Sequence, residues 1–153
     1  MAVDIADIYR DKNPVFLGIL KGSFIFMADL IRACNIRSEV EFVQCATYHG
    51  FDRSDDIEIT SFFDINKLKG RHVIIAEDIV DSGQTVGALA KELERIECAS
   101  LYLATLLYKP EAFTGARDPD LIGFSITNDF VIGYGLDYDG QARELRDIYV
   151  KCE

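Results

Sequence analysis

The chain has 153 residues, a formal net charge of -10 at pH 7 and a pI near 4.6. Its length predicts a single domain, residues 1–153, that can bury a sizeable core. The acidic balance, without a basic run or stripe, argues against a nucleic-acid partner, and no apolar stretch approaches the roughly 20 residues that a membrane span needs.

The N-terminus and the cysteines bear on the cellular location of the protein. The first residues, 1–4, lack the basic and then apolar pattern of a signal peptide. The four cysteines show no CxxC spacing, which is typical of reduced thiols rather than of a zinc site or a disulfide framework. We therefore expect a cytoplasmic protein.

The first part of the chain alternates between helix and strand. Residues 3–11 are expected to be the end of a helix, which Lys12-Asn13-Pro14 breaks. The apolar run 15–20 predicts a buried strand, and it ends in a short basic turn, Lys21-Gly22-Ser23. Residues 24–34 are apolar on nearly every side, which predicts a helix that packs on the sheet and on a neighbouring subunit.

A strand and a long polar loop follow. Residues 39–48 are the next predicted strand, and 49–64 are predicted to be a loop that flanks a short strand. Thr47 and Tyr48 open this loop, which is either part of a lid over a site or an ordinary surface loop.

The most informative stretch comes next. Residues 73–76 predict a strand buried on both faces, with Glu77 and Asp78 at its end. A third carboxylate, Asp81, opens the turn Ser82-Gly83-Gln84-Thr85. Such a turn, at the carboxyl end of a strand and the start of a helix, can aim N–H groups and hydroxyls at a phosphate. The acids suit sugar hydroxyls or a metal ion, so the stretch predicts a site for a phosphorylated sugar.

The rest of the chain continues the alternation. A helix with one apolar face is expected over residues 86–96. The later predicted strands are 101–107, 121–126, 130–136 and 147–152. This order of elements predicts an α/β domain with a mainly parallel, twisted sheet flanked by helices.

Most of the polar residues have an ordinary alternative when they are taken singly. Ser82 or Thr85 could cap a helix, whereas three carboxylates within five residues exceed what capping needs. Lys109 follows the strand 101–107 and falls on the same sheet edge as Asp81 if both crossovers are right-handed, but a lysine before proline is usually just solvated. Arg143 could be a surface charge.

Together, these segments resemble the type I phosphoribosyltransferases. The string from Glu77 to Thr85 has two acids, two apolar residues and Asp-Ser-Gly-Gln-Thr, which is similar to that family's phosphoribosyl-diphosphate motif with Ser82 in place of the usual threonine. Residues 20–24, Lys109 and the string 130–138 with Arg143 resemble the 6-oxopurine, or hypoxanthine-guanine, branch.

The resemblance implies an activity in purine salvage. It implies transfer of the 5-phosphoribosyl group from 5-phospho-α-D-ribose 1-diphosphate to hypoxanthine or guanine, with xanthine as a third candidate, to give IMP or GMP and diphosphate. It also implies Mg²⁺ as cofactor, the type I fold with a small hood from the C-terminal segment, a homodimer or homotetramer, and an N-terminus that is short for the family.

The resemblance further implies a role for each site residue. Asp81 is implied as general base or acid at the purine N7, and the Leu20–Lys21 peptide bond is implied to be cis. The implied ligands of Mg²⁺ are Glu77, Asp78 and Asp137. The implied contacts of the ribose, phosphate and diphosphate are Lys21, Gly22, Thr47, Tyr48, Glu77, Asp78, Ser82, Gly83, Gln84, Thr85 and Arg143. The implied contacts of the purine are Lys109, Phe130, Val131 and Asp137.

Two other classes of protein compete with this interpretation. A non-catalytic, nucleotide-sensing regulatory module on the same fold predicts a lost Asp81 or a basic face, and the sequence has neither. A phosphoacceptor signalling domain also combines acids at a strand end with a later lysine, but it does not explain the turn 82–85.

Overall fold

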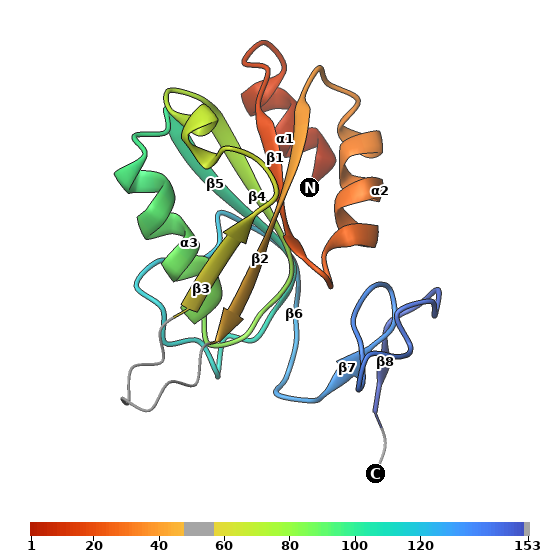
Figure 1. Cartoon of the computed structure of the whole chain (residues 1–153). Helices are drawn as coiled ribbons and strands as arrows, with labels where there is room; N and C mark the ends of the chain where they lie inside the picture. The colour runs from red at the N-terminus through yellow and green to blue at the C-terminus, as the bar shows by residue number, and fades with distance from the viewer. Residues whose placement is uncertain (48–56, 152–153) are drawn as a thin grey trace, which may run out of the picture.

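The computed structural model describes residues 1–47 and 57–151. Its centre is a six-stranded sheet with the order β3-β2-β1-β4-β5-β6 (Figure 1). Neighbouring strands run parallel except β2 and β3, which pair antiparallel. The elements are α1 (Ala2–Tyr9), β1 (Val15–Leu20), α2 (Phe24–Cys34), β2 (Glu39–Thr47), β3 (Ile57–Ser61), the 3-10 helix η1 (Ile65–Leu68), β4 (His72–Val80), α3 (Gln84–Arg95), β5 (Ser100–Tyr108), β6 (Leu121–Ser125), β7 (Val131–Ile132) and β8 (Tyr149–Val150). The predicted α/β architecture is confirmed.

The central strand differs from its prediction. β4 spans His72–Val80 rather than residues 73–76, so Glu77 and Asp78 lie inside the strand and not after it. The reason is that β5 keeps pairing with β4 as far as Val80 and Tyr108. The apolar run in β4 does not reveal how far β5 continues beside it. Glu77 and Asp78 are polar, so the sequence pattern placed the end of the strand before them.

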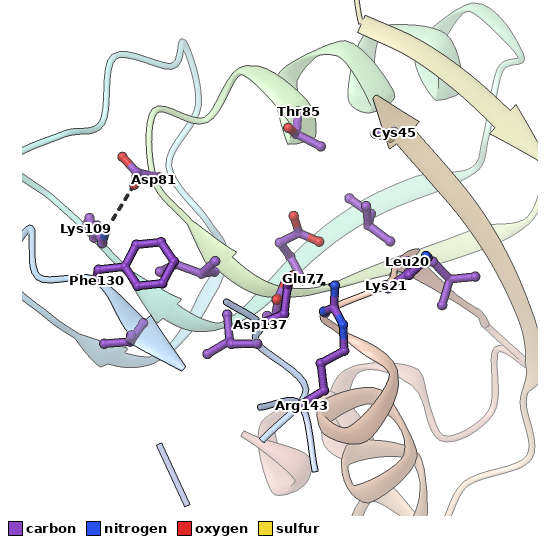
Figure 2. A pocket seen from close by; sticks show the side chains of 16 residues that line it. Leu20, Lys21, Cys45, Glu77, Asp81, Thr85, Lys109, Phe130, Asp137 and Arg143 are labelled. Carbon is purple, nitrogen blue, oxygen red and sulfur yellow. Dashed lines mark hydrogen bonds and ion pairs between the residues drawn. The ribbon is translucent and has the colours of Figure 1, made fainter. Parts of the chain in front are cut away.

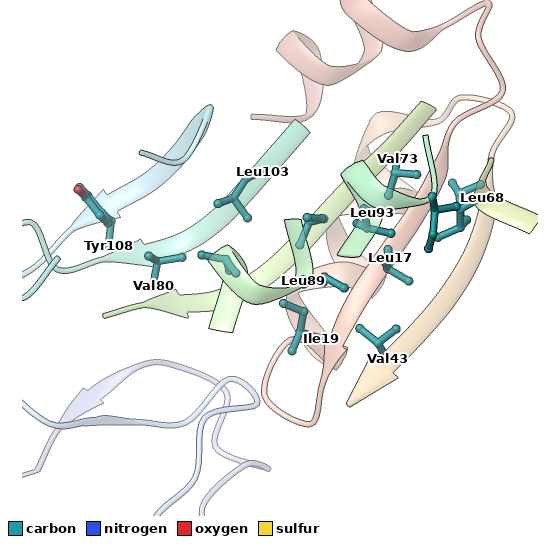
Figure 3. Packing of buried hydrophobic residues seen from close by; sticks show 14 residues of the cluster. Leu17, Ile19, Val43, Leu68, Val73, Val80, Leu89, Leu93, Leu103 and Tyr108 are labelled. Carbon is teal, nitrogen blue, oxygen red and sulfur yellow. The ribbon is translucent and has the colours of Figure 1, made fainter. Parts of the chain in front are cut away.

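Helices cover both faces of the sheet. Successive side chains of a strand point to opposite faces, and β1 follows this rule. Leu17 belongs to a buried cluster with Leu89 and Leu93 of α3 (Figure 3), whereas Phe16 belongs to a second cluster with Met27 of α2 and residues of α1. Because β1 and residues 73–76 of β4 are buried on both faces, these segments are continuous apolar runs rather than alternating ones.

The strand order reverses in the middle of the sheet. The chain passes from β1 through α2 to β2, and from β4 through α3 to β5, with the two helices on opposite faces. The pairing of β1 with β4 runs from Val15 to Gly18 of β1 and stops before the strand ends at Leu20. In open α/β sheets, ligands bind at the carboxyl ends of the strands where the order reverses in this way.

The C-terminal part of the chain forms the small hood that the resemblance implied. We call residues 127–151 the hood; its strands β7 and β8 pair with each other in a separate two-stranded sheet, beside one end of α2 in Figure 1. The strands predicted over 130–136 and 147–152 are wrong in length, since β7 and β8 have two residues each. Gly133, Tyr134 and Gly135 all have positive φ angles, and this turn ends β7.

The helices of the described residues are short. The longest, α3, has 12 residues. Within residues 1–47 and 57–151, none combines the length and the apolar character that crossing a bilayer requires.

Candidate active site

A pocket of about 420 Å³ opens where β1 and β4 stop pairing (Figure 2). Its walls come from the end of β1, the second half of β4 with the turn after it, the residue that follows β5, and the hood. The predicted site residues that line it are Lys21, Gly22, Glu77, Asp78, Asp81, Thr85, Lys109, Phe130, Val131, Asp137 and Arg143. The structure therefore brings together residues that lie more than 100 positions apart in the sequence.

The other predicted site residues lie beside this pocket or outside the described part of the chain. Ser82, Gly83 and Gln84 line an adjoining hollow of about 80 Å³, which shares Asp81 and Thr85 with the main pocket. Thr47 is the last residue of β2. Tyr48, the other predicted lid residue, lies outside the described residues.

The turn before α3 can hold an anion. Gly83 has φ 81° and precedes the first residue of α3, Gln84, whose N–H donates to Ser82 Oγ at 3.4 Å. A Cβ atom at Gly83 would overlap the ring of Phe113, so only glycine lets the turn pack this closely. The N–H groups of the first helical turn have no partners inside the helix, and together with the helix dipole they favour a phosphate in the adjoining hollow.

The acid pair of β4 is buried at the pocket wall. Glu77 is only 7% exposed, and its Oε2 atom has no hydrogen-bond partner among the described residues. Burial, with a smaller effect from the charge of Asp78, raises the pKa of Glu77 well above its usual range. An unpaired buried carboxyl oxygen is costly, so this atom is suited to receive a hydroxyl group or a cation from a ligand.

The pKa of Asp78 is also raised. Burial raises its pKa to about 6, against the backbone hydrogen bonds from Asp78 and Ile79 and the charge of Arg143, while Asp137 raises it further. A Cβ atom at Gly22 would overlap the Asp78 carboxylate. Glycine at this position therefore lets the turn after β1 approach the acid pair, and the Leu20–Lys21 peptide bond in that turn is cis, as expected.

Asp81 and Lys109 form an ion pair at the pocket rim. Lys109 Nζ lies 3.1 Å from Asp81 Oδ2, and the Lys109 N–H extends the β4–β5 ladder by donating to Val80 O at 3.0 Å (Figure 2). The prediction that both residues occupy one edge of the sheet is confirmed. Lys109 is only 8% exposed, so the alternative of a plain solvated lysine is wrong.

The hood supplies the opposite wall. Phe130 is 51% exposed and stands edge to face with Tyr138, their ring centres 5.9 Å apart. Arg143 pairs with Asp137 at 2.6 Å and donates to Gly135 O at 2.6 Å, so it is held within the hood rather than free at the surface. Asp137 also accepts the Gly140 N–H at 2.8 Å.

Five lining residues were not predicted as site residues: Ile19, Leu20, Cys45, Ile79 and Leu136. Cys45 is the one among them with a titratable side chain. Cys45 of β2 faces the pocket, and burial, with the nearby charge of Glu77, raises the pKa of its thiol to about 12. The register of the sheet carries the missing signal: Leu20, the last residue of β1, pairs with Gln44. The following residue of β2 therefore reaches the same edge as Lys21.

The arrangement combines four chemical functions in one pocket. It offers an anion cradle at α3, two buried acids at β4, an aspartate–lysine pair at the rim and an exposed aromatic ring on the hood. Such a set can hold a phosphorylated sugar against the acids and a flat heterocycle against the ring.

Three comparisons with known proteins bear on this site. The family described as phosphoribosyl transferase domain matches residues 1–139. The chain is 43% identical over 146 residues to a hypoxanthine-guanine phosphoribosyltransferase of Streptococcus pneumoniae, over 95% of this chain and 81% of that protein. It is 39% identical over 149 residues to a hypoxanthine phosphoribosyltransferase of Haemophilus influenzae, over 95% and 83%. A solved structure of Trypanosoma cruzi hypoxanthine phosphoribosyltransferase with the product IMP aligns with a TM-score of 0.87 at 40% identity, over 97% of this chain and 84% of that one.

Proposed function

The chain belongs to the phosphoribosyl transferase family, and we propose that it transfers the 5-phosphoribosyl group from 5-phospho-α-D-ribose 1-diphosphate to hypoxanthine or guanine. It is a purine-salvage enzyme, and its products are IMP or GMP and diphosphate. The observation that carries this proposal is the position of the Asp81–Lys109 pair, in one pocket with the anion cradle and Phe130. A base and a sugar phosphate can meet there.

We call the six-stranded sheet and the helices that cover it the body of the protein. The body binds the sugar phosphate. In our proposal, the 5′-phosphate lies in the cradle formed by Ser82, Gly83, Gln84 and Thr85 at the start of α3. Glu77 and Asp78 face the ribose hydroxyls, and the unpaired Glu77 Oε2 supports this placement because a hydroxyl donor would satisfy it.

Mg²⁺ is the proposed cofactor, held by Glu77, Asp78 and Asp137. Within the described residues, no three His, Cys, Asp or Glu side chains gather closely enough to hold a metal ion by themselves. Mg²⁺ is usually bound through one or two carboxylates together with substrate phosphates, so in our proposal the diphosphate would complete a coordination that these residues only begin. When bound, Mg²⁺ would neutralise charge on the departing diphosphate.

The diphosphate lies between the body and the hood. Lys21 and the Gly22 N–H are proposed to contact it from the turn after β1, and Arg143 from the hood. These two cations and the N–H donor stabilise the leaving group as the C1′–O bond breaks and the ribose becomes oxocarbenium-like. Thr47 and Tyr48 are proposed to belong to a lid that excludes water, which would otherwise hydrolyse the sugar.

The purine lies against the hood and the rim pair. Lys109 donates to O6, Asp81 faces N7, Phe130 stacks on the ring, and the backbone of Val131 and Asp137 meets its edge. The O6 and N7 atoms are neighbouring positions on one edge of the base, which suits two groups that lie 3.1 Å apart. As N9 attacks C1′, the proton on N7 must leave, and the Asp81 carboxylate is placed to accept it.

The broader setting is proposed on the same basis. Residues 1–153 act as one phosphoribosyltransferase domain in the cytoplasm, with xanthine as the third candidate base. The assembly is a homodimer or homotetramer, which the exposed apolar side chains of Phe24 and Val40 support. Size-exclusion chromatography with light scattering measures its size.

A product assay tests the proposal. The purified protein is incubated with 5-phospho-α-D-ribose 1-diphosphate, Mg²⁺ and hypoxanthine or guanine, and the nucleotide and diphosphate are quantified. Equal amounts of both products are expected. A protein that binds IMP but forms none would instead be the nucleotide-sensing regulatory module.

A further inference from the structure

The hood reaches the body of the protein through the turn Gly133-Tyr134-Gly135. The hood sheet does not pair with the six-stranded sheet, and Figure 1 shows it beside the end of α2. The position of the hood therefore depends on side-chain and turn contacts rather than on a continuous ladder of backbone hydrogen bonds.

Tyr134 makes two kinds of contact with the body. Its ring packs against the buried cluster of α1 and α2, and its hydroxyl donates to Asp29 Oδ2 of α2 at 2.7 Å. The backbone stays inside the hood, where the Tyr134 N–H donates to Leu145 O at 2.8 Å. Tyr134 thus joins two parts of the fold that are 105 residues apart in sequence.

The next residue rests on the turn that is proposed to bind diphosphate. Gly135 has φ 100°, and a Cβ atom there would overlap the carbonyl oxygen of Gly22. Arg143 donates to the Gly135 carbonyl at 2.6 Å and pairs with Asp137 at 2.6 Å. Any shift of the 133–135 turn is therefore passed to the hood's charged side chains at the pocket.

We propose that Tyr134, through its hydrogen bond to Asp29, is a positioning residue that holds the hood half of the site over the Lys21-Gly22 turn. This inference rests on the proposed function, because the groups it positions are the proposed contacts of purine and diphosphate. Neither Tyr134 nor Asp29 lines the main pocket, so neither touches the reacting atoms.

The expected signature is a change in KM rather than in kcat. If the hood occupies its binding position for a smaller fraction of the time, the apparent affinity for both substrates falls by that fraction. Once purine and diphosphate are bound, they bridge hood and body themselves, so turnover at saturation is preserved. The loss of one hydrogen bond to a charged acceptor predicts a rise in both KM values of about tenfold, with kcat within about twofold of wild type.

The experiment is a set of variants of the whole protein. Tyr134→Phe removes the hydroxyl, Asp29→Ala removes the acceptor, and the double variant forms a cycle. Asp29→Asn keeps an acceptor oxygen and is the rescue variant. Tyr149→Phe is the matched control, because that hydroxyl lies 3.5 Å from Asp147 Oδ2 inside the hood. Asp29 also lies 3.6 Å from Arg32, an exposed pair worth little by itself.

The expected result is that Tyr134→Phe and Asp29→Ala each raise both KM values, that the double variant is no worse than either, and that Asp29→Asn stays near wild type. Tyr149→Phe should leave KM unchanged. Independent, additive effects of Tyr134→Phe and Asp29→Ala, or an unchanged KM in Tyr134→Phe, would overturn the proposal.

A second measurement separates this inference from the proposed function. The amide chemical shifts of Lys21 and Gly22 report on the contact between hood and body without any substrate, because Gly135 rests against the Gly22 carbonyl. Tyr134→Phe should shift these resonances and leave those of β4 unchanged, whereas Tyr149→Phe should shift neither. If the wild type forms no IMP, the proposed function fails, and unchanged Lys21 and Gly22 resonances in Tyr134→Phe then overturn the positioning role as well.

Discussion

The two walls of the pocket are built in different ways. The body wall consists of buried parallel strands, and its charged residues Glu77 and Lys109 are less than one tenth exposed. The hood wall consists of two strands of two residues each, an exposed Phe130 and a turn of residues with positive φ. A rigid body wall is suited to place reacting groups, and a loosely attached hood is suited to close over a ligand. We therefore expect substitutions in the body to reduce turnover and substitutions in the hood to reduce affinity.

The largest expected effect lies on the body wall. Asp81→Asn should lower turnover by roughly 10²–10⁴-fold, because it removes the proposed proton acceptor at N7. Binding of 5-phospho-α-D-ribose 1-diphosphate should survive, which calorimetry measures. Asp7→Asn, an exposed carboxylate of α1, is the control. Turnover near that of the wild type would remove Asp81 from the mechanism.

Lys109→Met should have the next largest effect. It removes a donor from a nearly buried site, and a hydrogen bond to a charged group predicts a loss of about 10- to 100-fold in kcat/KM for hypoxanthine. Binding of the sugar diphosphate should change much less, since Lys109 faces the base. An equal loss for both substrates would place Lys109 elsewhere in the reaction.

The sugar diphosphate should bind between the two walls only when Mg²⁺ is present. The pocket holds the carboxyl groups of Glu77, Asp78, Asp81 and Asp137, and those that are ionised would repel a polyanion. With Mg²⁺, the sugar diphosphate at 100 times its Kd should stabilise the native protein by about 2.7 kcal/mol, or about 5–10 °C in Tm. The same Tm shift in the presence of a chelator would contradict a metal-dependent site.

The pKa of Asp78 depends on both walls of the pocket. Burial in the body raises it to about 6, while Arg143 of the hood lowers it and Asp137 of the hood raises it. Unfolded Asp78 has the ordinary value of 3.8, so the folded protein binds the extra proton between pH 4 and 6. Stability therefore falls as the pH rises through this window, by about 1–3 kcal/mol for this group.

Asp78→Asn isolates that contribution. The variant should be more stable than the wild type above pH 6, with a difference that shrinks towards pH 4, as thermal unfolding at several pH values will measure. Asp7→Asn, which removes an exposed carboxylate of α1, is the matched control. A variant that is less stable than the wild type at pH 7 would mean that the folded protein favours the charged form of Asp78.

The contrast between the regular body and the irregular hood also explains which parts of the structure the sequence could predict. The body elements follow from apolar runs and helical periodicity, so β1 and α2 begin and end at the predicted residues. The string from Glu77 to Thr85 pointed to the proposed sugar-phosphate site because its residues are adjacent in sequence. Their burial was not predictable, since it depends on how far β5 continues beside β4.

The hood was harder to predict for a physical reason. Its strands are too short to leave a periodic pattern, and its turn depends on contacts with distant residues, such as Gly135 with Gly22 and Tyr134 with Asp29. Cys45 was missed because its place at the pocket follows from strand register and not from its own type. Pairings of this kind appear only once the chain is folded.

The most direct test of the central claim is the choice between bases that differ at position 6. The measurement is the ratio of kcat/KM for hypoxanthine to that for adenine, with saturating sugar diphosphate and Mg²⁺. Lys109 has donors only, so it pairs with the O6 of hypoxanthine but meets another donor in the amino group of adenine. A site that hydrogen-bonds a substrate atom can reject a mismatched analogue by about 10⁴-fold or more, and we predict a ratio of that size. A ratio near one would contradict the assignment of Lys109 to position 6 and of the pocket to 6-oxopurines.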